Sequence, residues 1–386
     1  MLSQVSNLSF KSFFFFQVFL CYTSLMRKDF FTQSSKKKIG QAIHAYYREF
    51  GRDLPWRRDP AFYPVWISEI MAQQTRMEVV VSYHQNFMEA LPTIQDLADV
   101  QEEVLLKLWE GLGYYNRARN LKKAAQEIVY IRKEVPKSYE ELLSLPGVGP
   151  YTAAAIASIV YGQAYVALDG NLSRIFSRLL AYDGDIGKAQ AKEDLTSFGQ
   201  EVMGPDPSAF NQGLMDIGSK ICLPKDRALC PSCPLKAYCL AYQEGSVAKY
   251  PVKAPKKERK LVERTIFILV KNGALALKKR PDQGLLRGQW ELPGVDSYLD
   301  LEDAKALLLE RDLPFSSIKK GPSDKHLFSH IEWRMKSYLV QVRDLPFARE
   351  DDVLQYFSQE DLDQTIALPS AFKAFVQEWR QENERI

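Results

Sequence analysis

Apolar residues recur at helical spacing from Lys36 to about Tyr242, with few strand-like alternations. Such a period predicts that this part of the chain is nearly all helix. One clear segment is "PVWISEIMAQQTRMEVVVSYH", which we expect to form a single helix entered through Pro64. A second is "TAAAIASIVYG", a helix that we expect to end at Gly162.

The pattern changes after a basic stretch that contains proline. "RTIFILV", "ALALKKR" and "KSYLVQV" are short β-branched or alternating runs, and "LEDAKALLLERD" between them has a helical period. We therefore predict a multi-domain chain: an all-α domain at 30–245, a basic linker at 246–262 and a smaller α+β domain at 263–386. Residues 1–29 are predicted to be an N-terminal extension that is disordered or precedes the native start at Met26, because "SFFFFQVFLCY" is too short to span a bilayer.

Composition changes this picture little. The chain has 386 residues, of which 46% are apolar, and a formal charge of +3. Two domains with their own cores fit this length. So small a net charge permits a nucleic-acid partner without proving one, because binding depends on where the charge lies. The basic run "KYPVKAPKKERK" is equally typical of a solvated linker.

Four of the five cysteines lie close together, at Cys222, Cys230, Cys233 and Cys239, with seven, two and five residues between them. Disulfides are disfavoured in a large chain of this kind. A structural zinc site usually has two short ligand pairs far apart, whereas four thiolates in one compact loop suit an iron-sulfur cluster. The spacing favours the cluster and leaves zinc open.

Two further stretches have a shape that chemistry can use. "LPGVGPYTAAAIAS" is a glycine-punctuated turn that leads into a helix, at about 143–160, and Gly147 and Gly149 allow a DNA phosphate to approach the free N–H groups of that helix. This is the helix-hairpin-helix arrangement; an ordinary tight turn is the alternative. Asp169 in "YVALDGNLSRIF" is typical of a helix cap. Glu69 lies on or beside an apolar helix face, where desolvation raises a carboxyl pKa toward that of a general acid, although most such glutamates are structural.

Six segments, taken in order, resemble the MutY family of adenine DNA glycosylases, within the helix-hairpin-helix glycosylase superfamily. They are "LPWRRDPAFYPVWISEIMAQQT", "GLGYYNRARNL", "LPGVGPYTAAAI", "LDGNLSR", "FNQGLMDIG" and the cysteine loop. The resemblance implies a 4Fe-4S cluster on the four cysteines, bracing a loop that contacts DNA. One departure is that the family usually has six residues between its first two ligands, whereas this chain has seven.

The resemblance also implies the catalytic roles. Glu69 would protonate adenine N7, and Asp169 would stay ionised and stabilise the sugar cation or trap it covalently, with support from Tyr151 and Asn171. The endonuclease III branch of the superfamily has a nucleophilic lysine at the place of Tyr151, so we expect a monofunctional enzyme that leaves an abasic site.

The target base must leave the duplex to be reached. By resemblance, Gln212 would bind the extruded adenine, and Gln74 and Tyr114 would fill or prop the gap. A core aromatic and a solvated amide are the ordinary interpretations of the last two.

The second domain resembles a Nudix fold at "GLLRGQWELPG", but the glutamate-rich run that holds magnesium does not follow, so we expect no diphosphate hydrolysis. The family implies instead that Phe328, Ser329 and His330 in "HLFSH" engage 8-oxoguanine opposite the adenine; a plain strand connection is the alternative.

We expect the enzyme to excise adenine opposite 8-oxoguanine or guanine in double-stranded DNA. We also expect a monomer of the bacterial cytoplasm, associated with the nucleoid and not with a membrane. A sliding clamp or a mismatch-repair protein is a candidate partner that the sequence does not decide. Two other functions remain: a pyrimidine-lesion glycosylase with lyase activity, and a catalytically silent iron-sulfur DNA binder.

Overall fold

The computed structural model describes residues 30–255, 258–343 and 354–384. Contacts divide this part of the chain into two compact units, one containing 30–88 and 123–255 and the other 89–122 with the residues after 257. The first unit is helical and the second is α+β, which confirms the fold class. The predicted N-terminal extension lies outside the described residues. No helix in the described ranges is long and apolar enough to cross a membrane.

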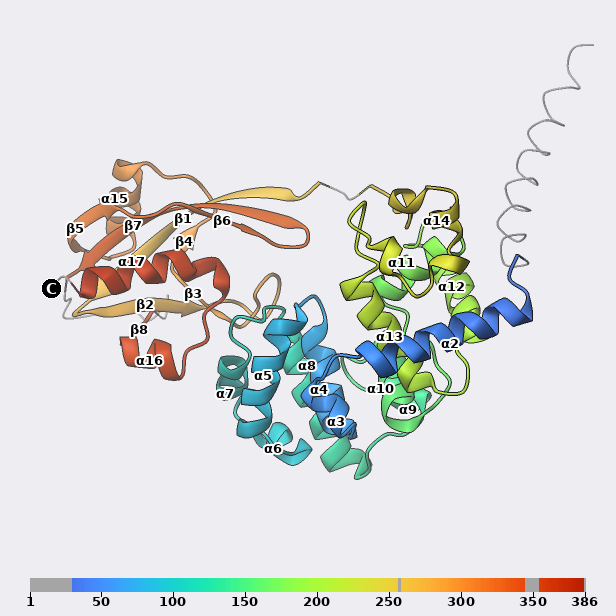
Figure 1. Cartoon of the computed structure of the whole chain (residues 1–386). Helices are drawn as coiled ribbons and strands as arrows, with labels where there is room; N and C mark the ends of the chain where they lie inside the picture. The colour runs from blue at the N-terminus through green and yellow to red at the C-terminus, as the bar shows by residue number, and fades with distance from the viewer. Residues whose placement is uncertain (1–29, 256–257, 344–353, 385–386) are drawn as a thin grey trace, which may run out of the picture. The chain divides into compact units, whose positions relative to one another are not determined.

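Helix α13 (Pro207–Lys220) lies at the centre of the first unit, where it packs against α2 (Gln33–Phe50), α10 (Pro150–Tyr161) and α11 (Gly170–Leu179) (Figure 1). Asp206 caps α13 by accepting a hydrogen bond from the Ala209 N–H. The remaining helices of this unit are α3 (Pro55–Arg58), α4 (Phe62–Ala72), α5 (Met77–Ala90), α9 (Tyr139–Leu143), α12 (Ala189–Val202), α14 (Leu240–Gln243), the π-helical η1 (Glu127–Arg132) and the 3-10 turns η2 (Cys230–Ser232), η3 (Lys236–Tyr238) and η4 (Val247–Lys249).

One predicted helix is in fact two. The sequence predicts one helix for the run from Pro64 to His84, but α4 ends at Ala72 and α5 begins only at Met77, on either side of the polar residues 73–76. Gln74 in the gap has φ +61°, a left-handed conformation that cannot continue a right-handed helix. The prediction for α10 is confirmed, because Gly162 ends it with φ +64°.

The second unit contains one sheet in which eight strands are described, with the order β3-β2-β1-β7-β5; β4 also pairs with β1, β6 with β7 and β8 with β2. The long strands β1 (Lys260–Lys271) and β7 (Ile331–Val342) run parallel, with Lys260 opposite Ile331. The other strands are β2 (Ala274–Lys279), β3 (Trp290–Glu291), β4 (Gly294–Val295), β5 (Phe315–Lys320), β6 (Asp324–Leu327) and β8 (Gln355–Phe357). The three sequence runs predicted as strands lie in β1, β2 and β7.

Both faces of this sheet are covered. Alternate residues of β1 point to opposite sides: Ile266 and Ile268 pack with Trp379 of α17 (Lys373–Asn383), and Phe267 packs with Leu308 of α15 (Leu301–Glu310). The apolar run that the sequence shows in β1 is therefore a strand buried on two sides. Helix α16 (Gln359–Gln364) and η5 (Ser370–Phe372) precede α17.

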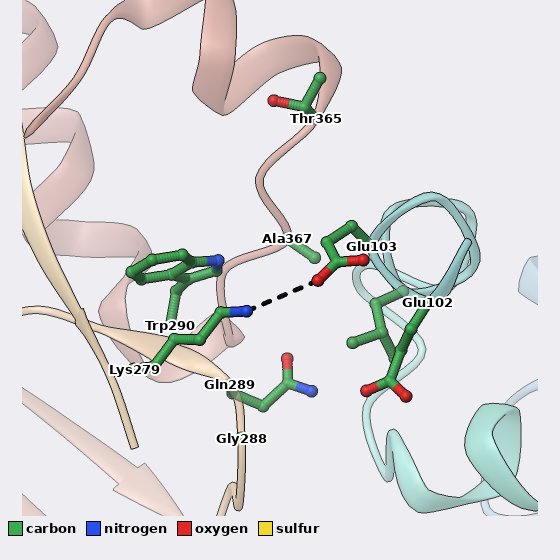
Figure 2. A pocket seen from close by; sticks show the side chains of 9 residues that line it. Glu102, Glu103, Lys279, Gly288, Gln289, Trp290, Thr365 and Ala367 are labelled. Atoms are coloured by element: carbon green, nitrogen blue, oxygen red, sulfur yellow. Dashed lines mark hydrogen bonds and ion pairs between the residues drawn. The ribbon is translucent and has the colours of Figure 1, made fainter. Parts of the chain in front are cut away.

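Residues 89–122 are close in sequence to the helical part but belong to the second unit. They form α6 (Ile94–Asp99), α7 (Glu102–Leu108) and the start of α8 (Asn116–Gln126). Figure 2 shows Glu103 of α7 reaching Lys279 of β2, at 3.5 Å, beside a cavity that Trp290 and Thr365 also line. The predicted boundaries at 245 and 263 follow the chain, whereas these contacts do not.

Candidate active site

The candidate catalytic carboxyl of Glu69 lies on α4 and is buried, with 7% of the residue exposed. The Tyr151 hydroxyl donates a hydrogen bond of 2.7 Å to Glu69 Oε2. Tyr151 stands in the first turn of α10, directly after Pro150, which can begin a helix because it needs no N–H partner there. The glycine turn of the helix-hairpin-helix thus delivers a phenol to a glutamate far away in the sequence.

The surroundings of Glu69 favour its protonated form. Burial raises the pKa of this carboxyl and the charge of Asp169 adds to the effect, while the Tyr151 hydrogen bond and the charge of Arg57 oppose it. The net shift is upward. Burial and the charge of Glu69 also raise the pKa of Tyr151 well above its ordinary value, so the phenol stays neutral and acts as a donor.

Asp169 is the N-cap of α11, as the sequence predicts. Its Oδ1 accepts from the N–H groups of Asn171 and Leu172, at 2.8 and 2.7 Å, and its Oδ2 accepts from Asn171 Nδ2 at 2.8 Å. Burial raises the pKa of Asp169, and these three hydrogen bonds oppose the shift. A cap is not the whole role of Asp169, because its charge reaches Glu69 and Tyr151.

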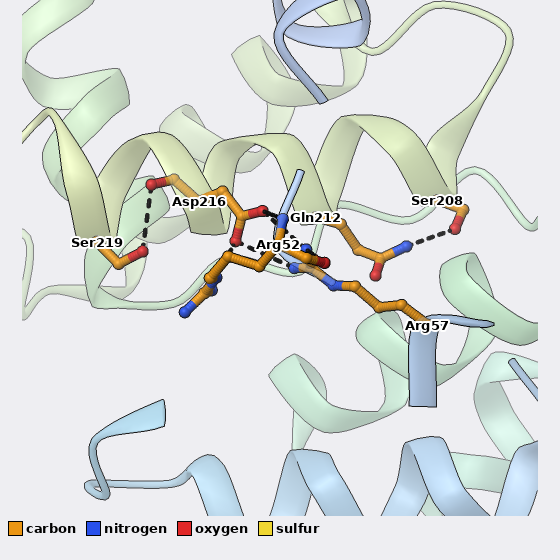
Figure 3. Close-up of polar contacts among 6 residues, drawn as sticks. All are labelled: Arg52, Arg57, Ser208, Gln212, Asp216 and Ser219. Carbon is orange, nitrogen blue, oxygen red and sulfur yellow. Dashed lines mark hydrogen bonds and ion pairs between the residues drawn. The ribbon is translucent and has the colours of Figure 1, made fainter. Parts of the chain in front are cut away.

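An ion-pair group beside this site is absent from the sequence prediction. The Asp216 carboxylate on α13 is fully buried and binds both Arg57, at 2.7 Å, and Arg52, at 2.5 Å (Figure 3). Arg52 and Arg57 also lower the pKa of Glu69. The available signal is an aspartate inside the apolar helix segment "LMDI", since buried carboxylates are rarely unpaired.

Gln212 lies one turn before Asp216 on α13 and is also buried. Its amide Nε2 donates to Ser208 Oγ at 2.9 Å (Figure 3). Gln212 and Asp216 share α13, so Gln212 lies close to the group of Arg52, Arg57 and Asp216. The predicted contact of Gln212 with adenine stays a prediction.

The two glycines of the helix-hairpin-helix turn differ in what they do. Gly147 has φ +78°, a conformation that disfavours other residues. Gly149 has an ordinary φ as N-cap of α10, and a Cβ placed there would meet no atom within 4 Å. Open space at a helix N-terminus is what a phosphate contact requires.

The two predicted wedge residues lie in different units. Gln74 is exposed in the turn between α4 and α5. Tyr114 follows Gly113 in the turn between α7 and α8, has φ +48° and is half exposed. Each therefore lies in a tight turn with a left-handed backbone. The half-exposed Tyr114 is not a core aromatic, whereas exposed Gln74 fits a solvated amide as well as a wedge residue.

The predicted recognition loop is the connection from β6 to β7. Ser329 and His330 are exposed, and Ser329 Oγ lies 3.1 Å from His330 Nδ1. Phe328 is half-buried instead, with its ring 4.9 Å from that of Trp333. The structure thus leaves two of the three residues free to meet a ligand, while Phe328 anchors the loop to its own domain.

The four cysteines come together in one loop that follows α13. Cys222, Cys233 and Cys239 pack against the core of the first unit, and the charges of the other three cysteines act on Cys239. Burial raises the pKa of Cys233 to about 11 and that of Cys239 to about 12. Among the described residues, no three His, Cys, Asp or Glu side chains are grouped as ligands of one metal ion.

Two arginines connect this loop to α11, the helix that Asp169 caps. Arg178 is fully buried, and its guanidinium donates to Cys222 Sγ and to the carbonyls of Leu223 and Lys225. Arg174 donates to the Cys222 carbonyl and to Asn171 Oδ1, at 2.7 and 2.8 Å. The signal in the sequence is two arginines four residues apart, a spacing that places both side chains on one face of α11.

Comparison with known proteins places both parts of the chain. Residues 67–201 match the family of HhH-GPD superfamily base excision DNA repair proteins, and residues 265–378 match the NUDIX domain. Among solved structures, a thermostable thymine-DNA glycosylase is 26% identical, with a TM-score of 0.48 over 55% of this chain and 98% of that one.

Curated relatives extend over most of the chain. The adenine DNA glycosylase of Homo sapiens is 33% identical over 86% of this chain and 72% of its own length. That of Buchnera aphidicola subsp. Acyrthosiphon pisum is 34% identical over 82% of this chain and 89% of its own length. Both relatives are more than 30% identical and are covered over more than two thirds of their length. The chain therefore belongs to the MutY family of adenine DNA glycosylases.

Proposed function

We propose that this enzyme, which excises adenine in base excision repair, acts on adenine opposite 8-oxoguanine or guanine and leaves an abasic site. The observation that carries the proposal is the buried group in which Tyr151 donates to Glu69 while the charge of Asp169 acts on both. Two carboxyls in unlike surroundings suit glycosidic cleavage, where one donates a proton and the other stabilises a cation.

The chemistry follows from those surroundings. Protonated Glu69 gives its proton to adenine N7, and the bond from C1′ to N9 breaks with its electron pair going to the base. The sugar becomes an oxocarbenium ion, which the Asp169 carboxylate stabilises until water adds at C1′ and loses a proton. Asn171 holds Asp169 in place by its hydrogen bond. The released products are adenine and an abasic sugar.

Tyr151 supports the monofunctional outcome. A lyase needs an amine that adds to C1′ and forms a Schiff base before the strand breaks. The Tyr151 phenol carries no nitrogen and cannot form one. Hydrolysis by water is then the route that remains at this site.

Base release should therefore become visible only after alkali. We expect a labelled duplex with adenine opposite 8-oxoguanine to yield cleaved strand when alkali follows incubation, because alkali breaks the abasic site. Without alkali the strand should stay intact. The measurement is electrophoresis of both samples, with a duplex containing thymine opposite adenine as the control for specificity.

The alternative functions predict different results in this electrophoresis experiment. Strand breaks without alkali would contradict the monofunctional proposal and favour a lyase. Absence of cleavage in both samples, with DNA binding retained, would favour the silent binder. Cleavage at a pyrimidine lesion but not at adenine would contradict the substrate assignment.

Recognition of the opposite base is the second part of the proposal. Ser329 and His330 are exposed at the tip of the β6–β7 connection, and both carry groups that can donate to a base or a phosphate. Rigid support from Phe328 against Trp333 suits a reading loop. These residues would engage 8-oxoguanine while the adenine is extruded.

The cysteine loop suits a 4Fe-4S cluster, and this too is a proposal. Four thiols are the donor set that such a cluster takes. Cys222, Cys230, Cys233 and Cys239 would each supply one thiolate to the cluster; a single zinc ion is the alternative that four thiols also suit. Within the longer first spacing, Lys225 has φ +60° and its carbonyl accepts a hydrogen bond from Arg178. When bound, the cluster would brace this loop.

Metal analysis tests the cluster directly. Protein purified without oxygen should contain about four irons per chain and absorb broadly in the visible range, since thiolate-bound iron and sulfide give such bands. Cys230→Ser should lower the iron content, because it removes one of the four thiolates. Zinc in stoichiometric amount without iron would contradict the cluster.

A further inference from the structure

The turn that carries Tyr114 is held by hydrogen bonds from neighbouring side chains. We name residues 111–115 the wedge turn; it connects α7 to α8 and includes Gly111 and Gly113 with φ +94° and +69°. The Trp109 indole N–H and the Arg117 guanidinium both donate to the Gly113 carbonyl, at 3.2 Å each. The guanidinium of Arg117 also lies 5.7 Å from the centre of the Tyr114 ring. A side chain that enters a duplex needs such a fixed base.

The second domain grips the chain just after the wedge turn. Arg287 Nε donates to Asn116 Oδ1 at 3.0 Å, and Arg119 Nη1 donates to the Arg287 carbonyl at 3.0 Å. Asn116 is the first residue of α8, two positions after Tyr114. One residue of the second domain therefore makes reciprocal contacts with the first turn of the helix that the wedge turn leads into.

The loop that bears Arg287 is itself well defined. It joins β2 to β3, and the Gly288 N–H donates to the Pro281 carbonyl at 3.0 Å while Arg280 Nε donates to the Leu285 carbonyl at 2.8 Å. Gly288 has φ +61°, and a Cβ there would lie 3.3 Å from Arg119 Nη2. These hydrogen bonds within the loop hold Arg287 in a defined position relative to β2 and β3.

A second grip lies before the wedge turn. Lys107 Nζ at the end of α7 donates to the carbonyls of Leu362 and Ile366, at 2.7 and 3.3 Å. Glu110 Oε1 accepts from the Leu368 N–H at 2.8 Å. Together with the pair of Glu103 and Lys279 in Figure 2, these contacts tie α7 to the sheet domain. The wedge turn is thus held on both sides by the same domain.

We infer that Arg287 is a positioning residue that fixes Tyr114 relative to the domain proposed to read the opposite base. The inference rests on the proposed function. Because Tyr114 and the β6–β7 loop belong to one compact unit, docking of the second domain on the damaged base would place the wedge, and a loosened wedge would uncouple recognition from extrusion. Arg287 does not touch the reacting atoms in this account and acts through Asn116 and Tyr114.

A double-mutant cycle separates this role from simple stabilisation. Single-turnover adenine release opposite 8-oxoguanine is measured for the full-length wild type, Arg287→Ala, Tyr114→Ala and the double variant. We expect Arg287→Ala to slow release about 10-fold in the wild-type background and less than about 2-fold when Tyr114 is already alanine, because residues acting through one element are not additive. Equal losses in both backgrounds, or no loss, would overturn the inference.

A second variant, at Asn116, keeps the test decisive if Arg287→Ala fails to fold. Asn116→Ala removes the same hydrogen bond while leaving the loop intact, and it should reproduce the Arg287→Ala rate; an unchanged rate would overturn the inference. Lys319→Ala is the matched control, because it removes an ion pair with Glu382 inside the second domain, and it should leave release unchanged. If the wild type releases no adenine, the proposed function itself fails; additive losses in an active enzyme overturn only the role of Arg287.

Discussion

Replacing Glu69 by glutamine is expected to lower the single-turnover rate of adenine release about 1,000-fold, in the range that loss of a general acid costs. Glutamine has nearly the same shape, and its amide oxygen can still accept the hydrogen bond from Tyr151. It cannot supply an acidic proton to adenine N7. The helical fold and DNA binding should therefore persist while the chemical step is lost.

The pH dependence of the rate checks that the lost group is an acid. Because burial raises the pKa of Glu69 above its ordinary 4.5, the protonated form persists to higher pH than in an exposed glutamate. The rate should fall as pH rises through this raised pKa, and the limb should be missing in Glu69→Gln.

Glu193→Gln is the matched control for this variant, since Glu193 is exposed on α12. It should keep the wild-type rate at every pH. An active Glu69→Gln enzyme with an unchanged pH profile would show that another group donates the proton, whereas loss of DNA binding would point to a structural role for Glu69.

Local sequence pattern carries a large part of the fold, for identifiable reasons. The strand β1 could be predicted because both of its faces are buried and the run is rich in β-branched and aromatic residues. The end of α10 could be predicted because Gly162 supplies the left-handed conformation of a helix C-terminus. Local pattern misses the break at Gln74, because neither a glycine nor a proline marks it and four polar residues in a row can also form the exposed turn of a continuous helix.

Some features of the candidate site could likewise be predicted from local sequence, and others could not. Local reasoning predicts Asp169 as a cap and Glu69 as an interfacial carboxyl, and both descriptions hold in the structure. The contact of Tyr151 with Glu69 depends on tertiary packing of α10 against α4, and the charge of Asp169 acts on both residues. The resemblance to the family, not the residues alone, pointed to it. The grouping of 89–122 with the second domain was likewise beyond local pattern, because contacts between distant segments create it.

Asp216→Asn should produce the largest loss of stability among the substitutions considered. Asp216 is fully buried between the guanidinium groups of Arg57 and Arg52. An asparagine oxygen can serve one of them, but its amide then faces the other as donor against donor. Removing one partner of a buried ion pair costs about 3–5 kcal/mol, because a buried charge stays uncompensated. For a unit of this size we expect the melting temperature of the helical part to fall by about 10 °C.

The neighbouring pair of Arg58 and Asp53 is the natural control. Both of its side chains are about 70% exposed, and exposed pairs contribute little because water screens them. Asp53→Asn should therefore leave the melting temperature nearly unchanged. Equal effects of the two substitutions would contradict the importance given to burial.

The contribution of Asp216 to stability should also depend on pH, in a direction that its pKa shift determines. Burial alone would raise the pKa of Asp216, but the hydrogen bonds and charges of Arg57 and Arg52 outweigh it, so the pKa lies below the ordinary 3.8. A carboxyl with a lowered pKa in the folded state stabilises the fold above 3.8, and it loses that contribution as pH falls through the lowered value. The gap between wild type and Asp216→Asn should thus be full at neutral pH and close below 3.8, as followed by thermal unfolding. A gap that stayed constant into acid would mean that Asp216 contributes through shape and not through its charge.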